Sequence, residues 1–105
     1  MKIIVFYVPY PTSEEARSVV VRALEQKLIA CGNIVSSQSL YLWNQVLNEE
    51  NEFIAILKTT SACVEKLTSF ISDNHSYDLP AIVHWEVNVN EEYAAWVEKQ
   101  TIQHQ

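Results

Sequence analysis

The chain has 105 residues, 49% of them hydrophobic and 10% aromatic, which suits one domain with a core and excludes a disordered protein. Seven Lys and Arg against thirteen Asp and Glu give a net charge of -6, and the scattered basic residues argue against a nucleic-acid-binding surface. No apolar run approaches the roughly 20 residues that cross a bilayer, and the cysteines form no C-x-x-C pair, so we expect a soluble, cytoplasmic single domain over residues 1–105.

The first predicted elements are a buried strand and a helix. Residues 3–8 form a continuous apolar run that ends at prolines, which is typical of a central strand. Thr12 precedes Glu15 by the spacing of a capping box, so a helix is expected to begin there. Its apolar stripe continues to Cys31, and Gly32, the only glycine in the chain, predicts the helix end.

A hairpin is expected next. Residues 33–43 alternate loosely around a polar middle, which is typical of an edge strand. The polar run 48–51 predicts the turn, and residues 52–60 return as a strand that is apolar on both faces and therefore central.

The rest of the chain predicts a second helix, a strand and a short third helix. Thr60 or Ser61 is expected to cap a helix that ends near residues 73–74, and a loop over 75–80 leads into a strand over 81–89. Asn90 is expected to cap the last helix, and residues 101–105 are expected to fray.

The order βαββαβ predicts an α+β ferredoxin-like sandwich, with an antiparallel sheet in strand order 4-1-3-2, two helices on one face and an extra C-terminal helix. Apolar residues alternate on both faces of the third strand, where Ile54 and Ile56 oppose Phe53, Ala55 and Leu57. Two helices cover only one face, so the other needs a partner. We therefore expect a homo-oligomer packed sheet against sheet.

With these elements placed, the chain resembles the CutA family, named for divalent-cation tolerance, over nearly its whole length. Several spaced motifs carry the resemblance: Val8-Pro9, Glu14-Glu15-Ala16, Leu28-Ile29-Ala30-Cys31-Gly32-Asn33-Ile34, Tyr41-x-Trp43, Ile56-Leu57-Lys58-Thr59, His75-x-Tyr77-Asp78-x-Pro80 and Tyr93-x-x-Trp96-Val97. The chain departs from the family at Ala81, where a glutamate is usual, and at Phe6, where some members have a cysteine.

The resemblance implies a PII-like homotrimer with clefts between subunits, and a non-enzymatic role in tolerance of divalent metal ions, chiefly copper. An alternative is a PII-like sensor or adaptor that binds a small metabolite in these clefts or contacts a protein partner. Catalysis has no support from the residues, because no nucleophile elbow is present and a single glycine excludes a phosphate-binding loop.

Two pairs of residues are candidate ligands for copper or another divalent cation. Cys31 and His75 offer a thiolate and an imidazole, and His84 and Glu86 share one strand face by alternation. The competing interpretation is structural: a buried thiol, a histidine at a helix end, and a partly solvated interface pair.

A candidate ligand cleft comes from the loop and the third strand. Tyr77 and Asp78 lie in the loop, and Lys58 lies near the end of the neighbouring strand. The resemblance places them with Trp43 of another subunit around a cleft. This group would bind a small anionic or zwitterionic ligand, or else lock the trimer together.

Overall fold

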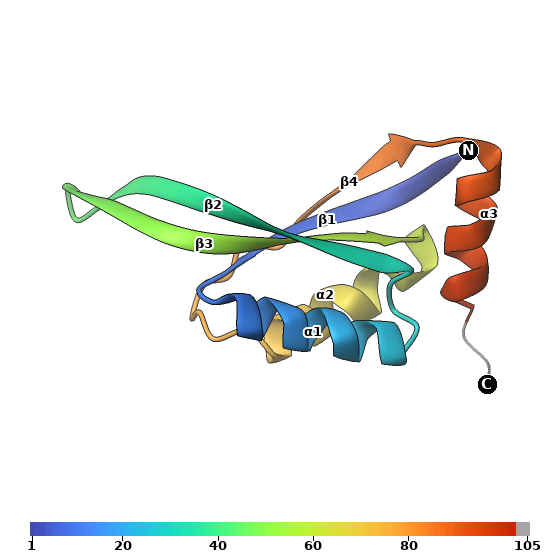
Figure 1. Ribbon diagram of the computed structural model, residues 1–105, viewed down its shortest axis with the longest axis horizontal. Coiled ribbons are helices and arrows are strands. Elements are labelled where there is room, and N and C mark those ends of the chain that lie inside the picture. Colours follow the sequence, from blue (N-terminus) through green and yellow to red (C-terminus); the bar gives the residue numbers. More distant parts are fainter. Residues whose placement is uncertain (103–105) are drawn as a thin grey trace.

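The computed structural model describes residues 1–102 and shows one antiparallel sheet with two helices below it and a third helix at its end (Figure 1). The strands are β1 (Lys2–Tyr10), β2 (Cys31–Trp43), β3 (Val46–Thr59) and β4 (Val83–Asn88). The helices are α1 (Ser13–Glu25), α2 (Val64–Asp73), which follows the 3-10 turn η1 (Ser61–Cys63), and α3 (Glu91–Gln100). The strand order β2-β3-β1-β4 confirms the predicted ferredoxin-like sandwich.

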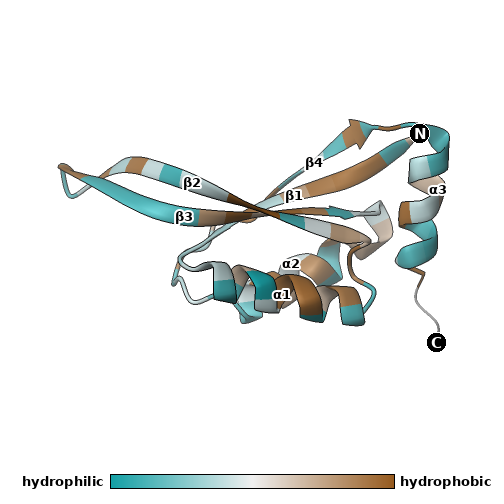
Figure 2. Ribbon diagram, in the orientation of Figure 1, coloured by the Kyte–Doolittle hydropathy of each residue, from teal (hydrophilic) through white to brown (hydrophobic). Residues whose placement is uncertain are grey.

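The face of the sheet toward α1 and α2, here called the covered face, holds the main core. Phe6 of β1 pairs with Leu57 of β3, and both are fully buried. α1 contributes Val19 and α2 contributes Leu67 and Ile71 to the same cluster. Hydrophobic residues colour much of β1 and the middle of α1 in Figure 2, which matches this core. Both helices thus bury one apolar stripe against the sheet.

The opposite face, here called the open face, is covered only at one end. Ala94 and Val97 of α3 pack over Ile3 and Val5 of β1. Farther along the sheet, apolar side chains remain accessible on three strands: Tyr7 is 38% exposed, Val35 46%, Val83 48% and Trp85 45%. The expectation that α1 and α2 leave one apolar face uncovered is therefore confirmed.

Strands β2 and β3 extend beyond the rest of the sheet. β3 pairs with β1 only as far as Phe53, whereas its pairing with β2 continues to the outermost pair, Trp43 and Val46. Residues 37–52, here called the arm, form a two-stranded ribbon that projects past α1 in Figure 1. The predicted turn at 48–51 is wrong, because the chain reverses at Asn44 and Gln45, both with positive φ. Two such residues make the tight turn that matches strand twist.

Gly32 lies inside β2 and not at a helix end, so that prediction is also wrong. α1 ends at Glu25, and Lys27 takes the left-handed conformation with a φ of 59°. The N–H of Leu28 then donates to the carbonyl of Ala23, which is the longer bond of a Schellman motif. Gly32 has no positive φ; an added Cβ would lie 2.9 Å from a methyl group of Val20. The glycine is needed for close packing of α1 on β2.

Several element boundaries also differ from the sequence prediction. The last strand starts at Val83, two residues later than expected. Asn90 is the N-cap of α3 as predicted, although its side chain makes no capping hydrogen bond. Thr101 does not fray: it is buried, and its hydroxyl donates to the carbonyl of Val97. Residues 103–105 of the predicted frayed tail lie outside the described residues.

Candidate functional site

His75 anchors the loop between α2 and β4 to the body of the domain. Its side chain is fully buried, and its Nε2 lies 2.7 Å from the carbonyl oxygen of Pro9. Its Nδ1 accepts the N–H of Tyr77 at 3.1 Å, which makes Nε2 the protonated nitrogen of a neutral ring. The imidazole also stacks on Tyr10, with centroids 4.4 Å apart. Every polar atom of the ring is therefore engaged in holding the loop.

A second set of contacts ties the same loop to α1. Thr12 accepts the N–H of Glu15, as the predicted capping box requires. The Glu15 carboxylate does not complete that box but accepts the N–H of Ser76 at 3.0 Å. Tyr10 lies beneath these contacts, and its hydroxyl has no partner among the described residues. Burial, with Glu15 nearby, raises the pKa of Tyr10.

Tyr77 connects the loop to the root of the arm. Its hydroxyl donates to Oε2 of Glu52 at 2.8 Å. Burial and this carboxylate raise the pKa of Tyr77, so the phenol stays protonated. Its ring also lies against His75, at 4.9 Å between centroids. The aromatic sequence Tyr10, His75 and Tyr77 thus runs from the core to the arm.

Between the arm and this loop lies a cavity of about 650 Å³, here called the arm cavity. The residues that line it are Pro9, Tyr41, Trp43, Asn48, Glu50, Glu52, Tyr77, Asp78, Leu79 and Ala81. Three of the four residues predicted for a ligand cleft, Trp43, Tyr77 and Asp78, therefore meet here within one chain. Lys58 does not line the cavity, and its ammonium group donates to the side chain of Asn33.

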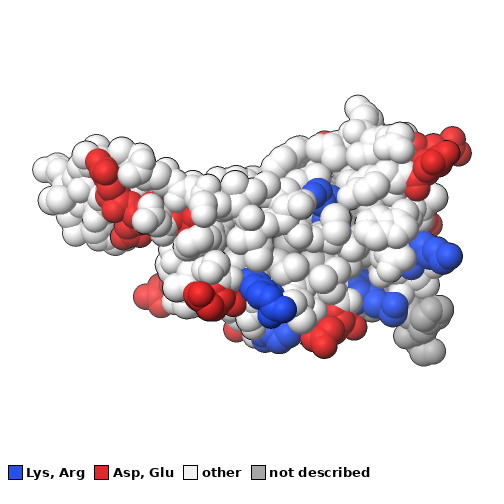
Figure 3. Space-filling view, viewed as in Figure 1, with Lys and Arg blue, Asp and Glu red and all other residues white. Residues whose placement is uncertain are grey.

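The arm cavity is an acidic site. Glu50, Glu52 and Asp78 line it, whereas none of its lining residues is Lys or Arg. Figure 3 shows acidic side chains and no basic ones on the visible face of the arm, whereas the body carries both signs of charge. Glu50 raises the pKa of Tyr41 through a hydrogen bond to its hydroxyl. The surroundings thus favour a cation, whereas the sequence predicted an anionic or zwitterionic ligand.

The four candidate metal ligands lie in different local settings. His84 of β4 stacks on Phe6, with centroids 4.9 Å apart, and Glu86 pairs with Lys2 at 3.3 Å. Cys31 begins β2, and its Sγ lies 3.3 Å from the hydroxyl of Tyr93. This contact, together with burial, raises the pKa of Tyr93 to about 12. Residues 1–102 contain no group of three or more His, Cys, Asp or Glu side chains positioned to hold a metal ion.

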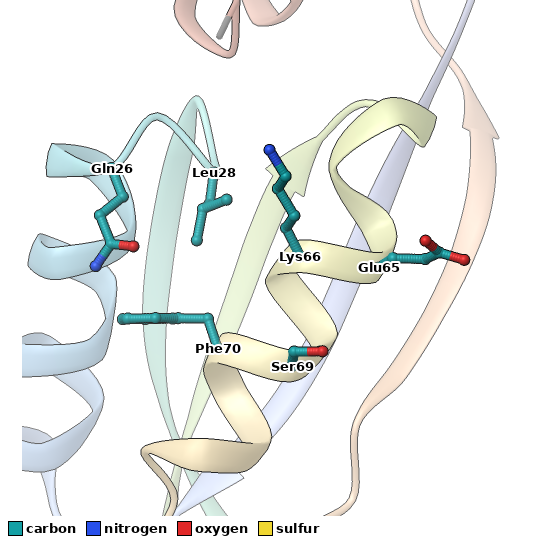
Figure 4. A pocket seen from close by; sticks show the side chains of 6 residues that line it. All are labelled: Gln26, Leu28, Glu65, Lys66, Ser69 and Phe70. Carbon is teal, nitrogen blue, oxygen red and sulfur yellow. The ribbon is translucent and has the colours of Figure 1, made fainter. Parts of the chain in front are cut away.

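A second hollow lies between the end of α1 and the outer side of α2 (Figure 4). It measures about 550 Å³, and Leu28 and Phe70 form its apolar floor. Glu65 and Lys66 sit on α2 at its edge, with Glu65 directed away from the hollow. No cluster of like charges and no stacked aromatic wall marks this surface, so it is a weaker candidate site than the arm cavity.

Sequence reasoning missed Tyr41, Glu50 and Glu52 as site residues. They lie on one face of the arm with Trp43 because alternate residues of paired strands share a face. The signal was the spacing of these residues, but it depends on the register. A turn placed at 48–51 instead of 44–45 assigns different partners to every residue of the arm.

Comparisons with known proteins converge on one family. Residues 4–100 match the family model described as CutA1 divalent ion tolerance protein. The divalent-cation tolerance protein CutA of Pyrococcus horikoshii is 38% identical over 99 residues, which cover 93% of this chain and 97% of that protein.

Solved structures agree with the sequence match. The crystal structure of CutA1 from Ehrlichia chaffeensis has a TM-score of 0.93 at 38% identity and covers 96% of each chain. The structure described as the periplasmic divalent cation tolerance protein CutA of Archaeoglobus fulgidus has a TM-score of 0.90 at 29% identity, covering 97% of this chain and 100% of that one. Within residues 1–102, no helix is long and apolar enough to cross a membrane.

Proposed function

The chain belongs to the CutA1 divalent ion tolerance family, and from this premise we propose that it contributes to tolerance of divalent cations, chiefly copper. The single observation that carries the proposal is the family match over residues 4–100. In this role the protein binds the metal ion and catalyses no reaction, and its proposed compartment is the cytoplasm.

The working form in this proposal is a homotrimer. The open face supports association, because accessible apolar side chains extend over β1, β2 and β4: Tyr7, Val35, Val83 and Trp85. The arm supports it as well, since a two-stranded ribbon is marginal by itself and this one carries exposed Leu40, Leu42 and Leu47. The number three follows from the family resemblance and not from these contacts.

Metal binding in this proposal uses residues of more than one subunit. Cys31 on β2 lies at the opposite edge of the sheet from His84 and Glu86 on β4, so neighbouring copies must bring the thiol to that pair. His84 and Glu86 are exposed on β4, at the edge of the sheet, where a second chain can approach. His75 is the least available of the candidates, because both of its ring nitrogens already have partners.

Native mass spectrometry during a Cu(II) titration tests assembly and metal binding together. We expect a trimer that takes up copper saturably, and a loss of at least one bound ion per trimer in Cys31→Ser or His84→Gln. Cys63→Ser is the matched thiol control. Cys63 is buried and its thiol contacts the carbonyl of Thr101, so the substitution should leave copper uptake unchanged. A trimer that retains no copper would contradict metal binding, and equal uptake by all variants would exclude Cys31 and His84 as ligands.

A further inference from the structure

The walls of the arm cavity combine aromatic side chains with carboxylates. Three aromatic side chains line it, Tyr41, Trp43 and Tyr77, and so do the three carboxylates described above. Aromatic faces attract cations through the ring quadrupole, and carboxylates attract them by charge. The volume of about 650 Å³ lies in the range of small-molecule sites.

The geometry favours an organic cation over a bare metal ion. A divalent ion needs several ligand atoms within about 2 to 2.6 Å of one point. The carboxylates of the arm cavity do not form such a cluster, and Glu52 already accepts the Tyr77 hydroxyl. A protonated amine or guanidinium on a short apolar chain can instead reach separate carboxylates and lay its carbon atoms against Trp43 and Leu79.

We propose that the arm cavity binds a small organic cation, a primary ammonium or guanidinium compound, between the aromatic wall of the arm and the loop that carries Tyr77 and Asp78. The inference stands on the lining of this cavity and does not depend on the role in copper tolerance. It also differs from the anionic or zwitterionic ligand expected from the sequence, because Lys58, the cation of that expected site, lies about 20 Å from Glu52 along β3 at the usual rise per residue.

The loop side of the cavity is preorganised for such a ligand. Tyr77 is fixed by Glu52 at its hydroxyl and by His75 at its ring, and His75 is itself locked between Tyr10 and Pro9. These contacts are all made within the chain, so this wall is positioned by the fold and its ordering costs little on binding. On the arm side, Trp43 is 65% exposed, so its ring is accessible to a bound cation.

The test uses the full chain labelled with ¹⁵N and follows its three tryptophan indole N–H signals by NMR. The probe is agmatine, which carries a guanidinium and an ammonium group on one butyl chain. We expect a saturable shift of the Trp43 signal in the millimolar range, assigned with Trp43→Phe, while the signals of Trp85 and Trp96 stay in place. Tetramethylammonium, which lacks N–H donors, should bind several-fold more weakly.

Three variants connect the shift to the cavity charges. Glu50→Gln and Asp78→Asn should each weaken agmatine binding about three- to tenfold, because each removes one charge-assisted contact. Both side chains are exposed, so the variants should fold normally. Glu65→Gln on α2 is the matched control: it changes the net charge equally, lies outside the arm cavity, and should leave the affinity unchanged.

Four results would overturn the proposal or a part of it. One is the absence of a saturable Trp43 shift with agmatine. Another is an equal response to malonate, a dianion, which would return the site to an anionic ligand, one of the two classes expected from the sequence. The third is equal weakening by Glu65→Gln and Glu50→Gln, which would show that only overall charge matters. Equal binding of tetramethylammonium would overturn the requirement for N–H donors.

Discussion

The two faces of the sheet are built from the same strands but end in different states. On the covered face, Phe6 and its neighbours are fully enclosed by α1 and α2. On the open face, α3 closes one end, and Tyr7, Val83 and Trp85 remain between 38% and 48% exposed. β1 supplies both faces, so its strand character says nothing about which face finds a partner within the chain.

The difference indicates that the covered face stabilises the folded chain and that the open face serves association between chains. The covered face supplies a core that a single chain can complete, and burial of its large side chains is the main stabilising term. The open face offers apolar area that one chain cannot bury, and such patches commonly mark interaction sites. Substitutions on the covered face should therefore lower the free energy of unfolding, and substitutions on the open face should change the oligomeric state.

The largest expected effect comes from adjacent residues of β1 that point to opposite faces. Phe6→Ala should lower the free energy of unfolding by about 3–5 kcal/mol, because it opens a cavity in a packed core. Tyr7→Ala should lower the free energy of unfolding by less than Phe6→Ala in dilute protein, since Tyr7 is 38% exposed in the single chain. Urea unfolding measures both, at several protein concentrations. Equal, concentration-independent costs would show that the two faces are not different.

The next effect concerns assembly. Val83→Asp places a charge on the open face, where a packed interface would leave it unpaired at a cost of several kcal/mol, roughly. We expect the oligomer to dissociate while circular dichroism shows a folded chain. Leu24→Asp on α1 is the control, because Leu24 is similarly exposed but lies on a helix outside the sheet. Light scattering that finds the same mass for both variants would place the interface elsewhere.

The sequence predicts the fold well because its strongest signals are periodic. Long apolar runs, the cap at Thr12 and the two-sided strand 52–60 locate the sheet order and the uncovered face correctly. Gly32 shows where this reasoning fails. A glycine fits both a left-handed helix end and a close approach of backbone to side chain, and only the packing of Val20 distinguishes them.

The candidate site was only partly predictable, because it depends on the register of the hairpin and on contacts between residues far apart in the sequence. Tyr77, Asp78 and Trp43 meet within one chain, whereas the expected cleft took Trp43 from another subunit. The turn at Asn44 and Gln45 carries no glycine to signal it. Because the turn was placed wrongly, Glu50 and Glu52 were not assigned to the site, and its acidic character was not predicted. His75 looked available as a ligand in the sequence, whereas its partners Pro9 and Tyr77 are visible only in three dimensions.

The smallest effect tests Tyr77, a side chain that joins the body to the arm. Tyr77→Phe removes the hydrogen bond to Glu52 and should cost about 1 kcal/mol near pH 8, because the bond is only part-buried. The sign of its pH dependence follows from the raised pKa of Tyr77 in the folded state. Unfolded tyrosine ionises near pH 10, whereas the folded phenol keeps its proton, so stability from Tyr77 is present below pH 10 and lost as the pH rises further.

Urea unfolding of the wild type and of Tyr77→Phe between pH 8 and 11 measures this difference, and Tyr10, whose pKa is also raised, cancels because both proteins contain it. We expect the advantage of the wild type to shrink above pH 10. Glu52→Gln keeps an acceptor for the phenol but removes the charge, so it should retain part of the advantage and weaken its pH dependence. An advantage that stays constant to pH 11 would mean that the Tyr77 phenol is not held by Glu52. The arm would then be positioned by its own pairing, and the arm cavity would lose its fixed wall.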